Sequence, residues 1–153
     1  MNLISMIGAA CLDPILRKKL YENPVNTAHT YGFYVDDVDA DILKAIFAKS
    51  AEIEMEFLNV QNRICHRPPC LLPPGSLTVI GAALLNKPLL DELFGRDPIQ
   101  SLNNRGFSLT FTDRYVLTAL ISGGEKEAEL KQALEALHKK ISSLIPTVMK
   151  KAA

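Results

Sequence analysis

The chain has 153 residues, of which 48% are hydrophobic and 22% are charged, a balance typical of a folded globular protein. Its 17 Lys and Arg residues equal its 17 Asp and Glu residues, and it contains no Trp. The chain therefore lacks the basic excess of nucleic-acid-binding proteins and is poor in the aromatic residues that stack on single strands. We expect neither a nucleic acid nor a membrane among its partners.

Residues 1–12 form an apolar segment that could be mistaken for a secretory signal. The segment has no basic n-region and is too short to span a bilayer, and Asp13-Pro14 then starts a new helix. The three Cys residues show no spacing typical of a disulfide framework, which agrees with a reducing compartment. These features predict a cytoplasmic protein.

Two stretches of the chain resemble each other. Residues 6–12, Met-Ile-Gly-Ala-Ala-Cys-Leu, reappear 73 positions later as Val-Ile-Gly-Ala-Ala-Leu-Leu. The offset grows to 74 positions where Gly32-Phe33 corresponds to Gly106-Phe107, and to 77 positions in the last helix of each copy. Because the matches follow one another in order, they indicate a tandem duplication of a unit of about 70 residues.

Both copies carry similar helix boundaries. An Asp or Asn before Pro favours a helix start, and this pair occurs at Asp13-Pro14, Asn23-Pro24 and Asp97-Pro98. Gly32 and Gly106 suit the left-handed position that ends a helix. A pair typical of a capping box follows each glycine, namely Asp36 with Asp39 and Thr110 with Asp113. The pattern predicts short helices, a Gly-Phe turn and a further helix in each unit.

Each unit ends in an amphipathic helix. Apolar residues recur at steps of four, three and four, at Ile53, Phe57, Val60 and Ile64 and again at Leu130, Leu134, Leu137 and Ile141. Such spacing is typical of a helix–helix contact. We expect the two stripes to pack on each other or on the core, and the alternative is an exposed stripe that awaits a partner.

A proline-rich segment separates the two units. It contains four Pro within residues 68–74, which excludes a helix there, and Ser76 is the expected cap of the next helix. The sequence predicts an all-α protein made of helical repeat 1 at residues 1–67, a linker at 68–75 and helical repeat 2 at 76–153.

The strongest candidates for chemistry lie in this linker and just before it. Cys65, His66 and Cys70 carry soft ligand atoms that suit zinc, and they could also form a redox pair or carry a modification. No second ligand pair accompanies them, so ordinary linker residues are the favoured interpretation and we predict no cofactor. Cys11 corresponds to Leu84 in the other copy and is predicted to be a core residue.

The remaining polar residues form no catalytic pattern. His29 and His138 accompany no nucleophile motif, and no phosphate-binding glycine loop is present. The aspartates of 36–41 suit a solvated helix start, Arg17-Lys18-Lys19 suits an exposed face, and Gly123-Gly124 suits a helix joint. We predict no intrinsic enzymatic activity.

The run Asp13-Pro14-x-x-Arg17-x-x-Leu20-x-x-Asn23-Pro24, with Tyr31-Gly32-Phe33 and an acidic helix start after it, resembles a known pattern. It is similar to the helical leader regions of ribosomally synthesised and modified peptides, of the nitrile-hydratase-like and nitrogen-fixation-cluster types. It also resembles the small alpha subunit of protocatechuate-type extradiol dioxygenases. The second copy carries the resemblance more faintly.

The leader resemblance implies a helical module that a peptide-modifying enzyme grasps. Because a charged helix follows Gly123-Gly124 in place of a core peptide, an accessory protein fits better than a precursor. The dioxygenase resemblance implies a non-catalytic subunit that covers a larger iron-bearing chain. We therefore expect a protein partner, either a modifying enzyme or a second copy of the chain, with Tyr31, Phe33, Arg105 and Phe107 as candidate contact residues.

Overall fold

The computed structural model describes residues 2–48, 50–65, 72–121 and 123–145, and all regular structure in them is helical. The helices are α1 (Leu3–Leu12), α2 (Pro14–Glu22), α3 (Pro24–Thr30), α4 (Asp37–Phe47), α5 (Ser50–Ile64), α6 (Pro74–Leu85), α7 (Lys87–Leu93), α8 (Pro98–Asn104), α9 (Phe111–Leu120) and α10 (Glu125–Leu144). The predicted all-α class is confirmed. Among the described residues, no helix combines the length and apolar character needed to cross a bilayer. We call α1–α5 the first half and α6–α10 the second half.

The predicted helix starts are confirmed by their side-chain caps. The Asp13 carboxylate accepts hydrogen bonds from the backbone N–H groups of Ile15 and Leu16, and Asn23 and Asp97 each accept one from the residue three positions on. These bonds satisfy N–H groups that have no partner inside the helix. The same device occurs at Asn86, which starts α7.

The two Gly-Phe turns are also confirmed. Gly32 and Gly106 have φ values of 79° and 89°, in the left-handed region that favours glycine. After each glycine the Phe N–H donates to a carbonyl five residues back, from Phe33 to Ala28 and from Phe107 to Leu102. Each turn therefore ends its short helix with the hydrogen bonds of a Schellman motif.

The start of α6 differs from the prediction. The helix begins at Pro74, inside the segment assigned to the linker, and its N-cap position is Pro73 rather than Ser76. Proline is tolerated in a first helical turn, where its missing N–H is not needed. Ser76 instead lies within the helix and is fully buried. Half of the predicted linker, residues 68–71, lies outside the described residues.

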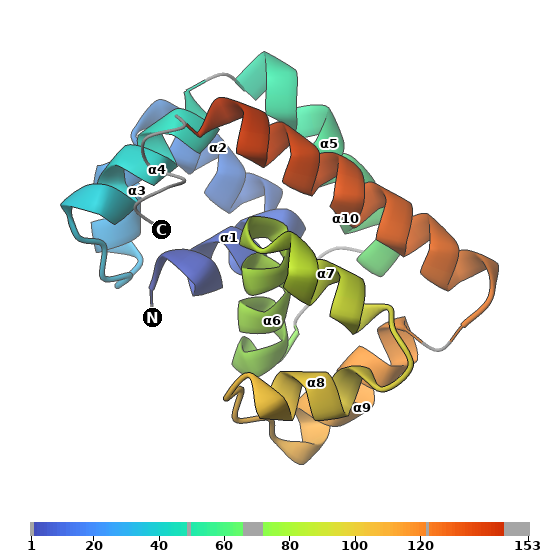
Figure 1. Ribbon diagram of the computed structural model, residues 1–153. Coiled ribbons are helices and arrows are strands. Elements are labelled where there is room, and N and C mark those ends of the chain that lie inside the picture. The colour runs from blue at the N-terminus through green and yellow to red at the C-terminus, as the bar shows by residue number, and fades with distance from the viewer. Residues whose placement is uncertain (1, 49, 66–71, 122, 146–153) are drawn as a thin grey trace.

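Helices α1 and α6 form the most extensive contact of the fold, at the centre of the molecule (Figure 1). Their backbones meet at two glycines: a Cβ atom on Gly8 would lie 1.9 Å from the carbonyl oxygen of Leu77, and one on Gly81 would lie 1.9 Å from that of Ile4. Between these contacts the Ser5 and Thr78 hydroxyls are 3.1 Å apart. The contact is reciprocal, because Ile4 and Leu77, Ser5 and Thr78, and Gly8 and Gly81 are all pairs 73 positions apart.

Helices α5 and α10 form the second extensive contact. The residues of both predicted stripes are buried except Ile64, which is half-buried, so packing of the stripes in the core is confirmed and an exposed stripe is wrong. Ion pairs join the two helices at both ends, Arg63 to Glu129 at 3.1 Å and Lys140 to Glu52 at 3.8 Å. These pairs are also reciprocal, since each residue corresponds to its counterpart with an offset of 77 positions.

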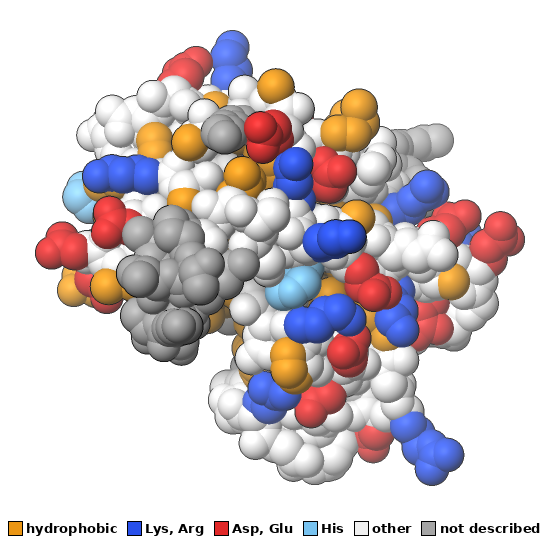
Figure 2. All heavy atoms as spheres, turned by 45° about the horizontal axis from the view of Figure 1, so that its top comes forward, with side chains coloured by type: hydrophobic (Ala, Val, Ile, Leu, Met, Phe, Trp, Pro, Cys, Tyr) orange, Lys and Arg blue, Asp and Glu red, His pale blue; other side chains and the backbone are white. Residues whose placement is uncertain are grey.

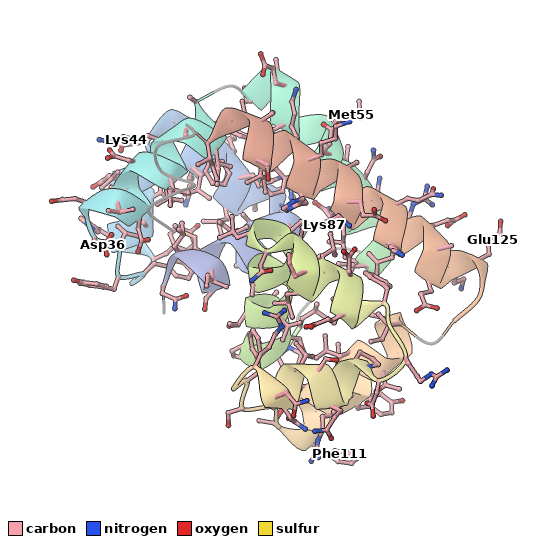
Figure 3. All side chains as sticks on the ribbon, viewed as in Figure 1. Asp36, Lys44, Met55, Lys87, Phe111 and Glu125 are labelled. Carbon is pink, nitrogen blue, oxygen red and sulfur yellow. The ribbon has the colours of Figure 1, made fainter. Side chains whose placement is uncertain are left out.

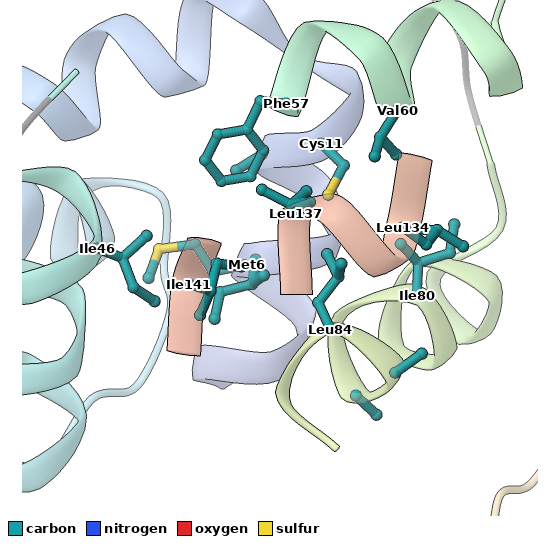
Figure 4. Packing of buried hydrophobic residues seen from close by; sticks show 14 of the residues in the cluster. Met6, Cys11, Ile46, Phe57, Val60, Ile80, Leu84, Leu134, Leu137 and Ile141 are labelled. Atoms are coloured by element: carbon teal, nitrogen blue, oxygen red, sulfur yellow. The ribbon is translucent and has the colours of Figure 1, made fainter. Parts of the chain in front are cut away.

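One hydrophobic cluster runs through both halves. It joins Met6 and Cys11 of α1 to Phe57 of α5, Leu84 of α6 and Leu137 of α10 (Figure 4). Burial of apolar surface is the main term that favours folding. The two halves are therefore stabilised together rather than by separate cores.

Candidate functional site

The Cys and His residues beside the linker are only partly placed by the structure. Cys65 follows the last turn of α5, where it is 4% exposed and its N–H donates to the carbonyl of Gln61. His66 and Cys70 lie outside the described residues, and so does any site that they form with Cys65. Within the described part of the chain, no three His, Cys, Asp or Glu side chains gather as a metal site would require.

The four candidate contact residues of the turns occupy three different surroundings. Tyr31 is partly exposed, with the Nζ atom of Lys19 5.5 Å from its ring centre. Phe33 is buried in the core at 6% exposure. Arg105 pairs with Glu92, and Phe107 is half-buried beside it in a pocket between the two halves. The structure therefore does not bring these four side chains into one surface.

Arg17 is not the exposed residue that the sequence predicted. Its side chain is 1% exposed, and its guanidinium binds Glu54, with the Nε atom 2.9 Å from Oε1 and the Nη2 atom 3.0 Å from Oε2. The same group donates to Gln61 and to the carbonyl oxygens of Ala10 and Cys11. Burial is tolerated because every arm of the guanidinium has an acceptor.

Tyr21 completes this network from the same helix. Its hydroxyl donates to Oε1 of Glu54 over 2.7 Å, and burial together with the hydrogen bond and the negative charge of Glu54 raises the pKa of Tyr21. The network joins α2 to α5 around Glu54. Its polar atoms all have partners, so it is a structural element rather than a reactive centre.

Cys11 lies fully buried, as predicted for a core residue. Burial raises the pKa of its thiol to about 12, although the nearby positive charge of Arg17 opposes the shift. A thiol is nucleophilic only as the thiolate, so Cys11 is inert at neutral pH.

The structure places the two remaining histidines in different surroundings. His29 is exposed on α3. His138 lies part-buried with its Nδ1 atom 2.8 Å from the carbonyl oxygen of Leu84, at the end of α6. His138 therefore satisfies a helix-terminal carbonyl that would otherwise lack a partner.

Asp113 confirms the predicted capping box and adds a contact that the sequence did not indicate. Its Oδ2 atom accepts from the N–H and hydroxyl of Thr110, both over 3.0 Å. Its Oδ1 atom accepts from the N–H and hydroxyl of Ser76, also over 3.0 Å. Burial disfavours the ionised carboxyl, but these four hydrogen bonds outweigh it and lower the pKa of Asp113.

The outer face of α9 carries two large, exposed aromatic side chains. Phe111 is 77% exposed and Tyr115, one helical turn later, is 69% exposed. With Arg114, Thr118 and Ala119 they line an open pocket of about 590 Å³. In Figure 3, Phe111 lies at the lower edge of the molecule, remote from the α5–α10 pair. Exposed apolar residues that adjoin one another often mark an interaction site.

Neither Phe111 nor Tyr115 is among the residues predicted from the sequence, although the sequence carries a signal for this face. The corresponding positions on α4, with the offset of 74, hold Asp37 and Asp41, both exposed. Aromatic residues thus stand on α9 where carboxylates stand on α4. Elsewhere the surface has a mixed character, and on the face in Figure 2 Lys and Arg side chains lie among Asp and Glu side chains.

Comparisons with known proteins add no relative to this description. The chain matches no protein-family model, no curated protein and no solved structure at a significant level.

Proposed function

We propose that this chain is a non-catalytic interaction protein and that the outer face of α9, defined by Phe111, Arg114, Tyr115, Thr118 and Ala119, is where a partner protein docks. The observation that carries the proposal is the exposure of Phe111 and Tyr115 on one helical face. Tyr and Phe are enriched at protein interfaces, and a cation among aromatic residues is a frequent companion there.

The partner class follows from the resemblance of the first half to peptide leader regions. A module of that kind is bound by an enzyme that modifies a peptide, and we propose such an enzyme as the partner. The large chain of an extradiol-type dioxygenase and a second copy of this chain are the alternative partners.

The experiment compares proteins captured from the native cell. Immobilised wild-type chain and the double variant Phe111→Ser/Tyr115→Ser are exposed to the same lysate, and bound proteins are cross-linked and identified by mass spectrometry. We expect the wild type to retain a peptide-modifying enzyme. The amount of that enzyme bound to the variant should be at least about tenfold lower, since truncation of each central aromatic residue costs on the order of 2 kcal/mol of binding free energy.

A matched control removes exposed apolar surface elsewhere. Ile15 and Met55 are 65% and 63% exposed on other helices, so Ile15→Ser/Met55→Ser changes surface hydrophobicity without touching α9. Equal loss in both double variants would contradict a site on α9. Recovery of a dioxygenase large chain would replace the proposed partner class, and a monomer without a bound protein would contradict the function itself.

We also propose that the two halves are copies of one unit that associate as an internal dimer. The reciprocal contacts of Gly8 with Leu77 and of Gly81 with Ile4, and the reciprocal ion pairs between α5 and α10, support this proposal. Two-fold interfaces have this property, because each contact occurs twice with the roles of the partners exchanged. If so, the first half and the second half, produced as separate fragments, are expected to associate when they are mixed.

A further inference from the structure

Asp39 and Asp113 occupy corresponding positions, 74 residues apart, but their carboxylates have different surroundings. Asp113 accepts four hydrogen bonds, two of them from Ser76 in the first turn of α6. The Asp39 carboxylate has a backbone hydrogen bond with Asp36, as Asp113 has with Thr110, but within the described residues it has no counterpart of the two hydrogen bonds from Ser76. The first turn of α1 is instead capped by Asn2, which accepts from the N–H of Ser5.

The difference arises because α4 does not close onto α1 as α9 closes onto α6. Helix α9 packs on α6, whereas α4 packs on α3, α5 and α10. An open pocket of about 490 Å³ remains where α4, the first turn of α1 and the turn after α8 come together. Asp39 lines this pocket at the place where Asp113 meets Ser76 in the other half.

The other walls of the pocket are mostly apolar. They comprise Leu3 and Ile4 of α1, Ile42 of α4, Ala82, Leu85 and Leu89 of the second half, and Phe107 of the second Gly-Phe turn. The cation that borders it, Arg105, pairs with Glu92. Desolvation and the neighbouring carboxylate of Asp36 raise the pKa of Asp39, and together they outweigh the backbone hydrogen bond with Asp36, which lowers it.

We propose that this pocket, defined by Asp39, Ile4, Ile42, Ala82, Leu85 and Phe107, binds a ligand that carries a primary ammonium group on an apolar body. The ammonium donates to the Asp39 carboxylate, as the N–H and hydroxyl of Ser76 donate to Asp113, and the apolar body lies against the leucine, isoleucine and phenylalanine side chains. Small pockets of this mixed character are typical of ligand sites. The shared chemistry fits both a free alkylamine and the N-terminal end of a peptide.

The experiment follows amide signals of the full chain by NMR at neutral pH. The probes are n-hexylammonium, leucinamide and N-acetyl-leucinamide, of which the third lacks the ammonium group. We expect the first two to shift the signals of Ile4, Ala82 and Phe107 in a saturable manner and the third to shift none. Tighter binding of hexylammonium than of leucinamide identifies a free amine as the ligand class, and the reverse order identifies a peptide end.

Asp39→Asn tests the role of the carboxylate, with Asp41→Asn as a matched loss of one charge at an exposed position of the same helix. We expect Asp39→Asn to weaken both ammonium probes at least about tenfold, the factor that 1.4 kcal/mol of binding free energy gives, and Asp41→Asn to weaken them less than about twofold. The spectra and melting temperatures of both variants report whether they fold. Equal binding by Asp39→Asn, equal binding of the acetylated probe, or shifts elsewhere would overturn the proposal, and none of these outcomes bears on a partner at α9.

Discussion

The two central helices, α1 and α6, end against different side chains. At the end of α1, the guanidinium of Arg17 donates to the carbonyl oxygens of Ala10 and Cys11. At the end of α6, the carbonyl oxygen of Leu84 meets Nδ1 of His138 instead. Cys11 and Leu84 correspond in the two halves, so one backbone requirement is met by a side chain from α2 in one half and from α10 in the other.

This difference between the halves involves two pairs of corresponding positions. Leu90 stands in α7 at the position of Arg17 in α2, and His138 stands in α10 at the position of Gln61 in α5. The long cation of the first half also requires Glu54 to balance its charge. The shorter imidazole of the second half reaches the carbonyl without such a partner. The two halves therefore meet the same backbone requirement at a helix end with different polar side chains.

The largest expected effect concerns the glycines that both halves share. We expect Gly8→Ala and Gly81→Ala each to destabilise the fold by about 4 kcal/mol or to prevent folding, because the new Cβ would lie 1.9 Å from a backbone oxygen that cannot move aside. Chemical denaturation of the two variants measures the loss. Similar losses would sharpen the comparison, since the two contacts are reciprocal.

A control shows how an exchange between alanine and glycine changes stability at a helix position without a close backbone contact. Ala128 is exposed on α10, and Ala128→Gly should destabilise by about 1 kcal/mol because alanine is the better helix former. If Gly8→Ala or Gly81→Ala instead stabilised the chain, helix propensity would dominate and the close crossing of α1 and α6 would be wrong.

The next effect tests the two ways of closing the central helices. Arg17→Leu places in α2 the residue that α7 has at this position, and we expect a loss of about 3 kcal/mol because two carbonyls, Gln61 and Glu54 lose a partner. Lys18→Leu is the control, since Lys18 is exposed next to it and should change stability by less than about 0.5 kcal/mol. If urea denaturation gives equal losses of stability for the two substitutions, the buried contacts of Arg17 do not stabilise the end of α1.

His138→Ala should cost less than Arg17→Leu, about 1 to 2 kcal/mol, because it removes one hydrogen bond to one carbonyl. The same denaturation experiment gives both values. A larger loss for His138→Ala would mean that the second half depends on its single contact more than the first half depends on its network.

The two corresponding aspartates should respond to pH in opposite directions. Asp113 has a lowered pKa in the folded state, so its contribution to stability is present above the ordinary value of 3.8 and is lost as the pH falls through its folded pKa. Asp39 has a raised pKa, so its protonation favours the folded state and this stability is lost as the pH rises above 3.8 through its folded pKa.

Substitution separates these contributions. We expect Asp113→Asn to cost about 2 kcal/mol at neutral pH, since an amide nitrogen then faces donors, and Asp39→Asn to be neutral or stabilising. Thermal denaturation between pH 3 and 7 tests the pair. If Asp113→Asn leaves the dependence of melting temperature on pH unchanged, the hydrogen bonds of Asp113 with Ser76 do not hold α9 against α6.

The smallest effect concerns the reciprocal ion pairs. A double-mutant cycle of Arg63→Ala and Glu129→Ala should give a coupling energy below about 1 kcal/mol, because both side chains are substantially exposed and screened by water. The coupling should weaken further in 1 M salt. A coupling of several kcal/mol would assign to the ion pairs a stabilising role that we assign to the buried stripes beneath them.

The sequence by itself determined the starts of α2, α3 and α8 and the ends of α3 and α8. Asp13, Asn23, Asp97, Gly32 and Gly106 act on backbone groups within a few residues of themselves, so their roles follow from the order of residues alone. The periodic stripes of α5 and α10 were equally legible, because a helix places residues three and four apart on one face. These local rules were sufficient for the all-α class.

Only the tertiary structure decided which polar and aromatic residues matter. Arg17 follows the pattern of an exposed basic run, yet Glu54 and Gln61, 37 and 44 positions away, turn it into a buried residue. Asp113 accepts a hydrogen bond from Ser76, 37 positions earlier in the chain, whereas Asp39 has no corresponding partner among the described residues. Phe111 and Tyr115 stay exposed because no other described segment packs over them. Each outcome depends on which distant segment of the chain packs against the residue. The close contact of α1 with α6 at Gly8 and Gly81 and the packing of α5 on α10 set this arrangement.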